Sequence, residues 1–522
     1  MTRLHEQTAF IRLEPLTPIH IGTGETMDPL SYIMKEEGGN PFLYSVDVPS
    51  WVEAHPDPAG LAELFSTKPL PEIRAHLAKE LAPLVEVYGG APVRVASREI
   101  YEKYVDELTK RDSANQLLID PALKNPLTGV LLVPGSSIKG AIRTAVIDWL
   151  DRNWKVDLRE AMNRDPRQGY ERALEELLGK VSENAFRNLK VGDFPAALGE
   201  SVIVTAKEVR RRYNPNKQES SKKPGGETRK NSCEATLSLS MSGQSPALYG
   251  KIAVGAHDAG SRDTALTVSM RGREKAWTLR ELMELCNEFY RERYSTERGA
   301  FYLQQHLDRS LAALKPVDAV MAEPGPDAMI LRLGHYSHVE CMTVTNNQPQ
   351  TRRLKDGSFM PSGTTRTLAD GIHPFGWARL SIVSAGEYAE ACARREEHDT
   401  AFLAERVRRR HVRLEEREAE TRKRAEREQA ERERQEAEAQ RQEELAAMTP
   451  EERLISAVES GGNENQAVEL YGKLDGLDEP LRRKSAQALR AFWEKAGKWE
   501  KKKCTDKQWV KVQKVRGILG DG

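Results

Sequence analysis

The chain has 522 residues, 30% of them charged, and its 79 basic and 79 acidic residues give a formal net charge of zero, so a polyanion would have to be bound by a local basic patch. The length predicts two to four domains with buried cores, and the absence of any apolar window of 18 residues disfavours a secreted or membrane-spanning protein. Five cysteines, far apart and without a Cys-x-x-Cys pair, disfavour a disulfide framework or a structural zinc site and favour a cytoplasmic protein.

The first predicted elements are a strand and a glycine loop. Residues 8–13 alternate apolar and polar side chains as a strand does, and His20, Gly22 and Gly24 follow in a proline-bounded segment. Beyond this loop the sequence predicts a strand pair that turns at a Gly-Gly-Asn and then several helices. The strands cover residues 31–34 and 42–46, and the helices cover residues 47–54, 60–87 and 97–108.

Residues 129–143 are the most informative stretch of the chain, and they read Gly-Val-Leu-Leu-Val-Pro-Gly-Ser-Ser-Ile-Lys-Gly-Ala-Ile-Arg. A β-branched run meets Pro134 and Gly135, which predicts a strand and a tight turn. Ser136 or Ser137 has the residue type that caps a helix. The stretch therefore predicts a strand, a turn and a helix that continues to about residue 154.

Two cations near the start of this helix indicate an anion site. Lys139 and Arg143 are four residues apart and would share one helix face, where they would add to the attraction of a helix N-terminus for phosphate. Gly140 leaves room for a close backbone approach. The stretch is not a Walker loop, because Lys139 precedes Gly140. An ordinary buried strand–turn–helix with exposed cations is the alternative.

A second basic feature follows the predicted strand at residues 201–206. Residues 207–230 hold nine cations and three acids and have almost nothing to bury, which predicts a basic loop between two strands, the second at residues 233–240. Such a loop suits a phosphate backbone through counterion release, with contacts expected from Arg210, Arg211 and Arg212 and base stacking from Tyr213. A solvated surface loop without a function is the alternative.

The second half of the chain repeats this mixture of strands and helices. Strands are predicted at residues 247–254, 327–333, 339–344 and 378–383, and helices at residues 278–293 and 296–314. The spacing is that of antiparallel hairpins rather than of strict strand–helix–strand alternation. This pattern favours an α+β fold.

The composition changes after about residue 391. Residues 394–447 are nearly all Glu, Arg, Ala and Gln, with Glu and Arg recurring at i, i+4, which predicts a single helix with side-chain ion pairs rather than a coiled coil. Thr449 and Glu452 then have the types and spacing of a helix cap. The small helical domain that follows has a basic end with three interleaved tryptophans, which suits either a packed core or contact with a single-stranded nucleic acid.

The sequence lacks a complete catalytic or metal-binding set. No nearby acid or cysteine has the placement that would complete a metal site with His335 and His338. No Gly-x-Ser-x-Gly elbow is present. His20 beside the glycine loop could act as a general base for RNA cleavage, with Lys139 stabilising the developing charge, but packing or an RNA contact is the preferred role of this histidine.

Four segments resemble the RAMP superfamily of CRISPR effector subunits, which are built from ferredoxin-like (RRM-like) domains. They are residues 18–24 (Pro-Ile-His-Ile-Gly-Thr-Gly), residues 133–145 (Val-Pro-Gly-Ser-Ser-Ile-Lys-Gly-Ala-Ile-Arg-Thr-Ala), residues 191–194 (Val-Gly-Asp-Phe), and residues 331–334 (Leu-Arg-Leu-Gly) with residues 374–377 (Pro-Phe-Gly-Trp). Their order is most similar to the proteins that cap the 3′ end of the CRISPR RNA in type III-A (Csm) complexes. The resemblance covers roughly residues 5–390.

The resemblance implies RNA binding within a ribonucleoprotein. It implies contacts with the CRISPR RNA and other Csm subunits, especially the backbone RAMP subunit, and a part in maturing the RNA 3′ end, with host nucleases as possible partners. Its residue matches place Ser136, Ser137, Lys139 and Arg143 against the RNA backbone and make Gly22 and Gly24 an adjacent glycine loop. The sequence departs from the family after Gly334, where His-Tyr-Ser-His replaces most glycines of a second loop.

We therefore predict an α+β protein with two fused ferredoxin-like domains, a long charged helix and a small all-α domain. The boundaries are an N-terminal domain at residues 1–206, a basic loop at 207–231, a second domain at 232–393, the helix at 394–447 and the basic helical domain at 448–522. The expected function is a non-catalytic RNA-binding cap subunit without a cofactor. The alternatives are a metal-independent endoribonuclease that uses His20 and a scaffold organised by the charged helix.

Overall fold

The computed structural model describes residues 6–110, 117–180, 182–210, 228–244, 246–255, 265–303, 305–347 and 365–521. Contacts divide the chain into two compact units, Met1–Leu414 and Glu415–Gly522. Within the described residues, no helix combines the length and apolar character that a membrane span requires. The first unit contains every sheet, and the second is helical.

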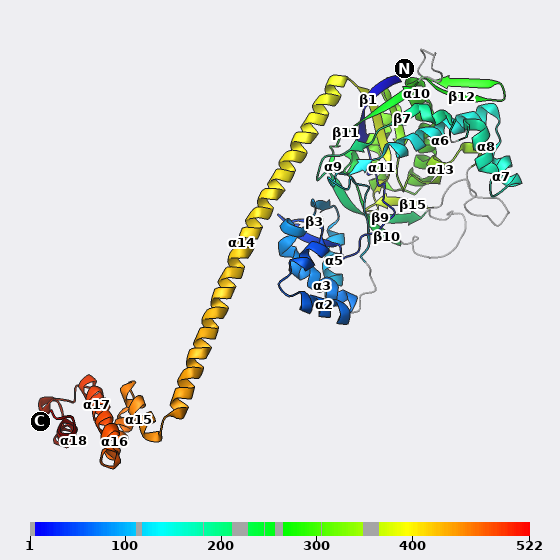
Figure 1. Ribbon diagram of the computed structural model, residues 1–522. Coiled ribbons are helices and arrows are strands. Elements are labelled where there is room, and N and C mark those ends of the chain that lie inside the picture. Colours follow the sequence, from blue (N-terminus) through cyan, green and yellow to red (C-terminus); the bar gives the residue numbers. More distant parts are fainter. Residues whose placement is uncertain are drawn as a thin grey trace. The chain divides into compact units, whose positions relative to one another are not determined.

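The first sheet of the N-terminal unit is antiparallel and five-stranded, in the order β14-β17-β1-β11-β7. Its strands are β1 (Glu6–Pro15), β7 (Leu189–Val191), β11 (Leu248–Gly255), β14 (Ala328–Arg332) and β17 (Trp377–Val383). Helix α6 (Gly135–Trp154) lies between β1 and β7 in the chain, and α10 (Leu279–Glu297) lies between β11 and β14 (Figure 1). The order β17-β1-β11-β7 with these two helices is that of a ferredoxin-like fold, and the α+β class is confirmed.

One face of this sheet forms the main core. Ile11 and Leu13 of the central strand β1 are fully buried and belong to the same cluster as Ile138 and Ile142 of α6 and Phe289 of α10. The alternate side chains of β1 therefore lie on the opposite face, as the two-residue period of a strand requires. The sheet draws strands from both segments that the sequence assigns to separate domains, and two separate ferredoxin-like domains stay a prediction.

A second sheet runs in the order β16-β15-β9-β4-β3-β2, with β10 beside β9 and β5 beside β10. Its strands are β2 (Tyr32–Glu37), β3 (Asn40–Ser45), β4 (Val93–Val95), β5 (Ile119–Asp120), β9 (Ser201–Arg210), β10 (Thr228–Thr236), β15 (Thr365–Ala369) and β16 (His373–Pro374). The predicted turn between β2 and β3 is confirmed, because Gly38 and Gly39 have φ values of +57° and +80°. Such values suit glycine.

Further helices and strands complete the first unit. They are α1 (Val48–Glu53), α2 (Pro58–Thr67), α3 (Leu70–Leu81), α4 (Val85–Tyr88), α5 (Arg98–Thr109), β6 (Leu132–Val133), α7 (Leu158–Arg164), α8 (Gly169–Leu178), β8 (Phe194–Pro195), α9 (Leu239–Ser242), β12 (Leu266–Met270), β13 (Arg273–Trp277), α11 (Asp308–Ala313), α12 (Lys315–Ala322) and α13 (Val339–Met342). The helix predicted at residues 97–108 is confirmed by α5. The hairpin of β12 and β13 was not predicted, and it turns at Arg271 and Gly272, both with positive φ.

Two predicted elements differ in the structure. The helix predicted at residues 296–314 is interrupted by a π-helical turn (Arg298–Leu303), in which Phe301 and Tyr302 are both buried. The strand predicted at residues 339–344 is instead the short helix α13. The reason is that the backbone oxygens of Glu340 and Thr343 accept from the Arg293 guanidinium, at 2.7 and 3.2 Å, rather than from a neighbouring strand.

A buried ion network joins the two sheets. Glu297, the last residue of α10, pairs with Arg332 of β14 at 2.6 Å and with Arg366 of β15 at 2.5 Å. Arg366 also pairs with Glu340 at 3.0 Å. The side chains of Glu297, Arg332 and Arg366 are each at most 6% exposed. Because a buried charge needs a partner, this network holds the first sheet, α10 and the second sheet together.

Helix α14 (Ala385–Ala447) confirms the predicted charged helix and begins nine residues earlier than expected. Its first part packs on its own unit, where Asp399 accepts from the backbone N–H of Leu198 at 2.8 Å and Arg406 donates to the backbone oxygen of Gly89 at 2.6 Å. Phe10 of β1 contacts Tyr388, with ring centroids 4.8 Å apart. These contacts explain why the helix starts on the sheet before the charged repeat begins.

The second unit contains four short helices around a core of its own. They are α15 (Pro450–Glu459), α16 (Glu464–Lys473), α17 (Glu479–Lys495) and α18 (Asp506–Leu519). Thr449 and Glu452 form the predicted capping box at the start of α15. Leu470, Leu489 and Val512 are completely buried in the shared cluster, so this unit has the core of an independent small domain.

Candidate nucleic-acid interface

Helix α6 begins at Gly135, directly after β6. Pro134 occupies the N-cap position with extended backbone and without a side-chain cap bond, so the prediction that Ser136 or Ser137 caps this helix is wrong. The reason is that Asp193, in the link between β7 and β8, accepts from the N–H of Gly135 at 2.9 Å. A carboxylate brought in from a distant segment thus satisfies the first free amide of the helix.

Gly135 also brings the helix start onto the sheet. A Cβ atom at this position would lie 2.1 Å from the backbone oxygen of Val191 and 2.7 Å from that of Gly192. Only glycine fits at this distance. The close backbone approach at Gly135 is therefore made by β7 of the same chain.

The predicted RNA-binding residues of α6 lie together on one stripe. Ser136, Lys139, Gly140 and Arg143 are spaced i, i+3, i+4 and i+7 and are exposed or half-buried, with Ser137 at the border. The opposite face carries the buried side chains of Ile138, Ile142, Ala145 and Val146.

The two cations of this stripe are available to a ligand. Among the residues that the structure describes, no carboxylate forms an ion pair with Lys139 or Arg143. Partial burial lowers the pKa of Lys139 from its ordinary value. A Cβ atom at Gly140 would meet no atom within 4 Å, so the surface between the two cations has room for a phosphate backbone.

The glycine loop lies one segment away from this stripe. Gly22 bridges to Ala122, and Ile21 accepts from the N–H of Leu123 at 2.8 Å. Lys124 in turn bridges to Leu131, just before α6. Gly24 has a φ of +86°, and both loop glycines are exposed. The structure therefore brings the glycine loop and the start of α6 together through residues 121–131.

His20 lies inside the protein, with 4% of its surface exposed. Its Nδ1 donates to the backbone oxygen of Glu234 at 2.7 Å, and its ring stacks on Tyr336 with centroids 5.7 Å apart. Burial lowers the pKa of His20, which favours the neutral ring. The structure thus places His20, a predicted RNA contact, in the interior. Its ring supports the glycine loop and does not face solvent.

The second loop of the family pattern also faces inward. Gly334 has a φ of +90°, and a Cβ atom there would lie 2.3 Å from the backbone oxygen of His20. Tyr336 and Ser337 are buried, whereas His335 is exposed. The close approach at Gly334 is therefore made by the protein backbone at His20.

The tip of the predicted basic loop is outside the described residues. Arg210 is the last residue of β9, and Thr228 begins β10. Arg211, Arg212 and Tyr213 lie in the part of the chain that the structure does not describe, and their RNA contacts stay a prediction.

Glu234 of β10 organises the interior of this site and was missed at the sequence level. Its side chain accepts from Lys124 at 2.8 Å, from the hydroxyl of Ser201 at 2.7 Å and from the N–H of Ala122 at 3.3 Å. Only 1% of this side chain is exposed. Since its backbone oxygen also holds His20, one residue fixes both segments that flank the glycine loop.

Glu234→Gln is expected to lower the free energy of unfolding by about 1 to 3 kcal/mol, because the change removes the negative charge that pairs with Lys124 and leaves buried polar groups poorly satisfied. Urea unfolding of the full chain measures this loss. Glu36→Gln is the control, since the ion pair of Glu36 with Arg98 is exposed and 3.4 Å long and should contribute less than about 1 kcal/mol. Equal losses in both variants would contradict the role of Glu234.

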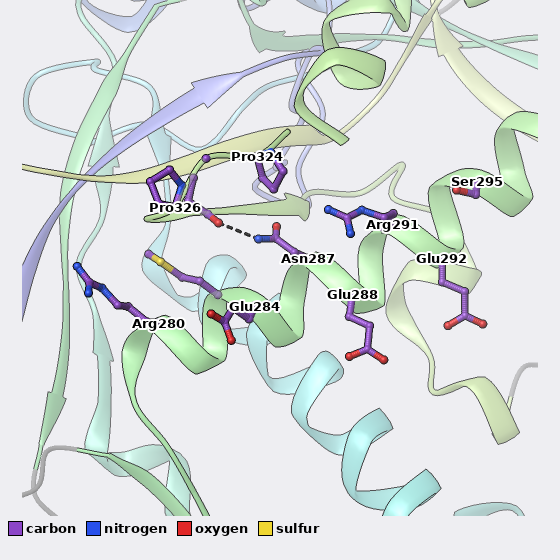
Figure 2. A pocket seen from close by; sticks show the side chains of 12 residues that line it. Arg280, Glu284, Asn287, Glu288, Arg291, Glu292, Ser295, Pro324 and Pro326 are labelled. Atoms are coloured by element: carbon purple, nitrogen blue, oxygen red, sulfur yellow. Dashed lines mark hydrogen bonds between the residues drawn. The ribbon is translucent and has the colours of Figure 1, made fainter. Parts of the chain in front are cut away.

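A cavity beside α10 is a different kind of site. It has a volume of about 600 Å³ and lies between α10 and residues 324–328 (Figure 2). Asn287 at its floor donates to the backbone oxygen of Ala328 and accepts from the N–H of Ile330, at 2.8 and 2.9 Å. Its lining mixes three glutamates with two arginines and contains no residue of α6, so this cavity does not extend the cationic stripe; these side chains are Glu284, Glu288, Glu292, Arg280 and Arg291. The described residues contain no group of three or more His, Cys, Asp and Glu placed to hold a metal ion.

The match to a protein-family profile agrees with the sequence motifs. A profile of the RAMP superfamily matches residues 12–302. A chain in the cryo-EM structure of a Csm–crRNA–target RNA ternary complex of a type III-A CRISPR-Cas system is 17% identical, with a TM-score of 0.45 and coverage of 72% of this chain and 100% of that chain. The crystal structure of T. onnurineus Csm5 is 14% identical, with a TM-score of 0.38 and coverage of 71% and 100%. No curated protein matches the chain. The profile match includes the glycine loop, α6, Asp193 and Glu234.

Proposed function

The chain belongs to the RAMP superfamily, and from this premise we propose that it is an RNA-binding subunit of a type III CRISPR effector complex. The more specific form of the proposal is a cap subunit of a type III-A (Csm) complex, which contacts the 3′ region of the CRISPR RNA and takes part in its 3′-end maturation. The order of the four sequence motifs supports this form. Its partners would be the backbone RAMP subunit and other Csm subunits, with separate nucleases for trimming.

The observation that carries the proposal is the exposed stripe of α6 beside the glycine loop. Lys139 and Arg143 are about 6 Å apart along the helix axis at 1.5 Å per residue, which suits adjacent phosphates of a single strand. Gly140 lies between them without a side chain. This arrangement contacts the RNA backbone and no base edge. A subunit that binds one region of guide RNAs with many different sequences requires a contact of this kind.

We further propose that the subunit binds RNA rather than cuts it. His20, the candidate base, is buried, and its Nδ1 is bonded to a backbone oxygen. A general base must reach the hydroxyl that it deprotonates, and this ring lies beneath the loop. Cleavage of repeat RNA without metal that disappears in His20→Ala would overturn this part and favour the endoribonuclease alternative.

The double variant Lys139→Ala with Arg143→Ala is expected to weaken binding of a single-stranded RNA by about tenfold or more at 0.1 M salt. The slope of log affinity against log salt should fall by about 1.4, because each lost phosphate contact on a single strand contributes about 0.7. Filter binding or fluorescence anisotropy at several salt concentrations measures both quantities.

The matched control is Lys155→Ala with Arg159→Ala. These cations have the same spacing, lie at the other end of α6 and in α7, and are exposed. The control should change the affinity by less than about twofold. Equal weakening by both pairs, or none by the first, would refute the proposed role of the stripe.

A further inference from the structure

The second unit carries a dense group of lysines at one end. We name as the lysine surface the seven lysines of residues 495–511, which lie at the end of α17, in the connection from α17 to α18 and in the first half of α18. They are Lys495, Lys498, Lys501, Lys502, Lys503, Lys507 and Lys511. The same segment holds two acidic residues, Glu500 and Asp506. A chain with zero net charge thus concentrates positive charge outside the part that matches the RAMP profile.

These lysines are not needed for the fold of the unit. The core consists of side chains from all four helices, with Leu470, Leu489 and Val512 at its centre, and each of the seven lysines is exposed or half-buried. Lys498 pairs with Glu464, and Lys503 pairs with Glu500 at 3.3 Å.

Most lysines of the lysine surface form no ion pair within the described residues that would compete with a ligand. Within the described part of the chain, no carboxylate forms an ion pair with Lys495, Lys501, Lys502 or Lys507. Lys501 and Lys502 lie on a fully exposed helical turn, and Lys507 is in the first turn of α18. Repulsion between like charges this close is unfavourable unless a polyanion covers them.

The packing of the three tryptophans in this part of the chain indicates what kind of contact the lysine surface makes. Trp493 is buried in the core. The ring of Trp499 is covered by Arg490 and Arg516, at 5.6 and 5.2 Å from its centroid, and Arg516 also lies 5.5 Å from the centroid of Trp509. Trp499 and Trp509 are half-buried and pack against the same core cluster, so packing is the role that the structure shows for them. Most lysines of this surface are more exposed than these rings and offer their charges to a backbone.

We propose that the lysine surface is a second nucleic-acid site, which binds the phosphodiester backbone of RNA or DNA without reading bases. An acidic protein is a poorer fit, because lysine is depleted in protein interfaces and their aromatic anchors are missing here. The site lies beyond residue 302, where the RAMP profile ends. It therefore does not depend on the function proposed for α6.

The test uses the full chain with Lys501→Gln, Lys502→Gln, Lys503→Gln and Lys507→Gln combined. The probes are a 30-nucleotide mixed-sequence single-stranded RNA and a 30-base-pair mixed-sequence DNA duplex, and the duplex has about three helical turns. The variant should bind at least one probe about tenfold or more weakly, with a salt slope reduced by about 0.7 to 0.9 for each lost contact. A loss on RNA alone, DNA alone or both identifies the bound nucleic acid.

The matched control removes four exposed cations from the second part of α14, where acidic residues alternate with them. It combines Arg422→Gln, Lys423→Gln, Arg427→Gln and Arg432→Gln and should bind both probes within about twofold of the parent. Parental binding of both probes by the lysine variant would overturn the proposal. Displacement of the probes by polyglutamate as effectively as by nucleic acid would overturn it in favour of an acidic protein.

The two nucleic-acid proposals fail separately. If Lys139→Ala with Arg143→Ala leaves RNA binding intact while the lysine variant weakens it, the α6 proposal falls and the second site stands. The opposite result removes the second site and leaves the α6 proposal. Circular dichroism of each variant should match the parent, because all the substituted side chains lie outside the hydrophobic cores.

Discussion

Glu297→Gln is expected to lower the free energy of unfolding of the N-terminal unit by about 3 to 5 kcal/mol, the usual cost of removing one partner from a buried ion pair. Glutamine keeps the shape of the side chain but leaves Arg332 and Arg366 without the charge that both contact. Chemical denaturation of the full chain at pH 7, followed by tryptophan fluorescence, measures the loss. Trp377 in this unit reports on it, because Arg332 lies 4.9 Å from its ring centroid.

The loss of unfolding free energy in Glu297→Gln should depend on pH, because the carboxyl group of Glu297 titrates. Burial alone would raise the pKa of Glu297, but the charges of Arg332 and Arg366 outweigh burial and lower it. A carboxyl group with a lowered folded pKa stabilises the protein above its unfolded pKa of about 4.3 and loses this contribution as the pH falls through the folded value. The difference between parent and Glu297→Gln should therefore narrow below about pH 4.

Glu176→Gln is the control for this network. Glu176 pairs with Arg271 at 2.5 Å, but both side chains are more than half exposed, so the loss should stay below about 1 kcal/mol. Two results would show that the buried network does not join the sheets as described. One is a loss below about 1 kcal/mol in Glu297→Gln, and the other is a stability difference between parent and Glu297→Gln that grows toward acid pH.

Gly135→Ala is expected to destabilise the N-terminal unit by about 3 kcal/mol and to weaken RNA binding. The added methyl group would overlap the backbone oxygen of Val191, and overpacking against a backbone that cannot move is at the high end of such costs. Relief of the overlap would pull α6 away from β7 and break the bond between Gly135 and Asp193. Thermal unfolding and RNA affinity should both fall.

Gly140→Ala, five residues further along α6, should give the opposite change in stability. Its Cβ atom meets nothing within 4 Å, and replacing glycine by alanine inside a helix stabilises by about 0.5 to 1 kcal/mol. If the RNA backbone passes between Lys139 and Arg143, this methyl group should nevertheless weaken binding. Increased stability with unchanged RNA affinity would argue against a close approach at Gly140.

The local part of the site was predictable from the sequence. The strand, the turn and the helix over residues 129–154 follow from side-chain periodicity and from Pro134 and Gly135. Helical geometry then puts Lys139 and Arg143 on one face, as the structure confirms. The cap of this helix was not predictable in this way. Asp193, which accepts from the first helical N–H, is 58 residues from Gly135 in the sequence. Ser136 and Ser137 stand at the helix start and have a higher preference for the cap position than Pro134, which occupies it.

The buried acids were missed for a related reason. Glu234 follows Cys233 in a predicted strand, and Glu297 is the second residue of the helix predicted at residues 296–314. Nothing in either segment marks these acids as buried. Their partners are 110 residues away for Glu234 and Lys124, and 35 and 69 residues away for Glu297 with Arg332 and Arg366. Local periodicity reveals which face of an element is apolar, but it does not reveal which charges a tertiary fold will enclose.

The charged helix and the helix cap that follows it were predictable because their signals are local. Repeated Glu and Arg at i, i+4 and the cap at Thr449 need no distant partner. The exact use of Trp499 and Trp509 was open, since their coverage by Arg490 and Arg516 depends on how α17 packs against α18.

The pairing of β1 has a consequence for how this protein is made. Its two neighbours in the sheet, β11 and β17, follow it by more than 230 and 360 residues. At about 5 to 20 residues per second, the first strand waits on the order of 10 to 50 seconds for β11 and longer for β17 during translation. Both edges of β1 lack their partner strands for that time, so nascent chains that stop before residue 377 should be prone to aggregate and to need chaperone protection.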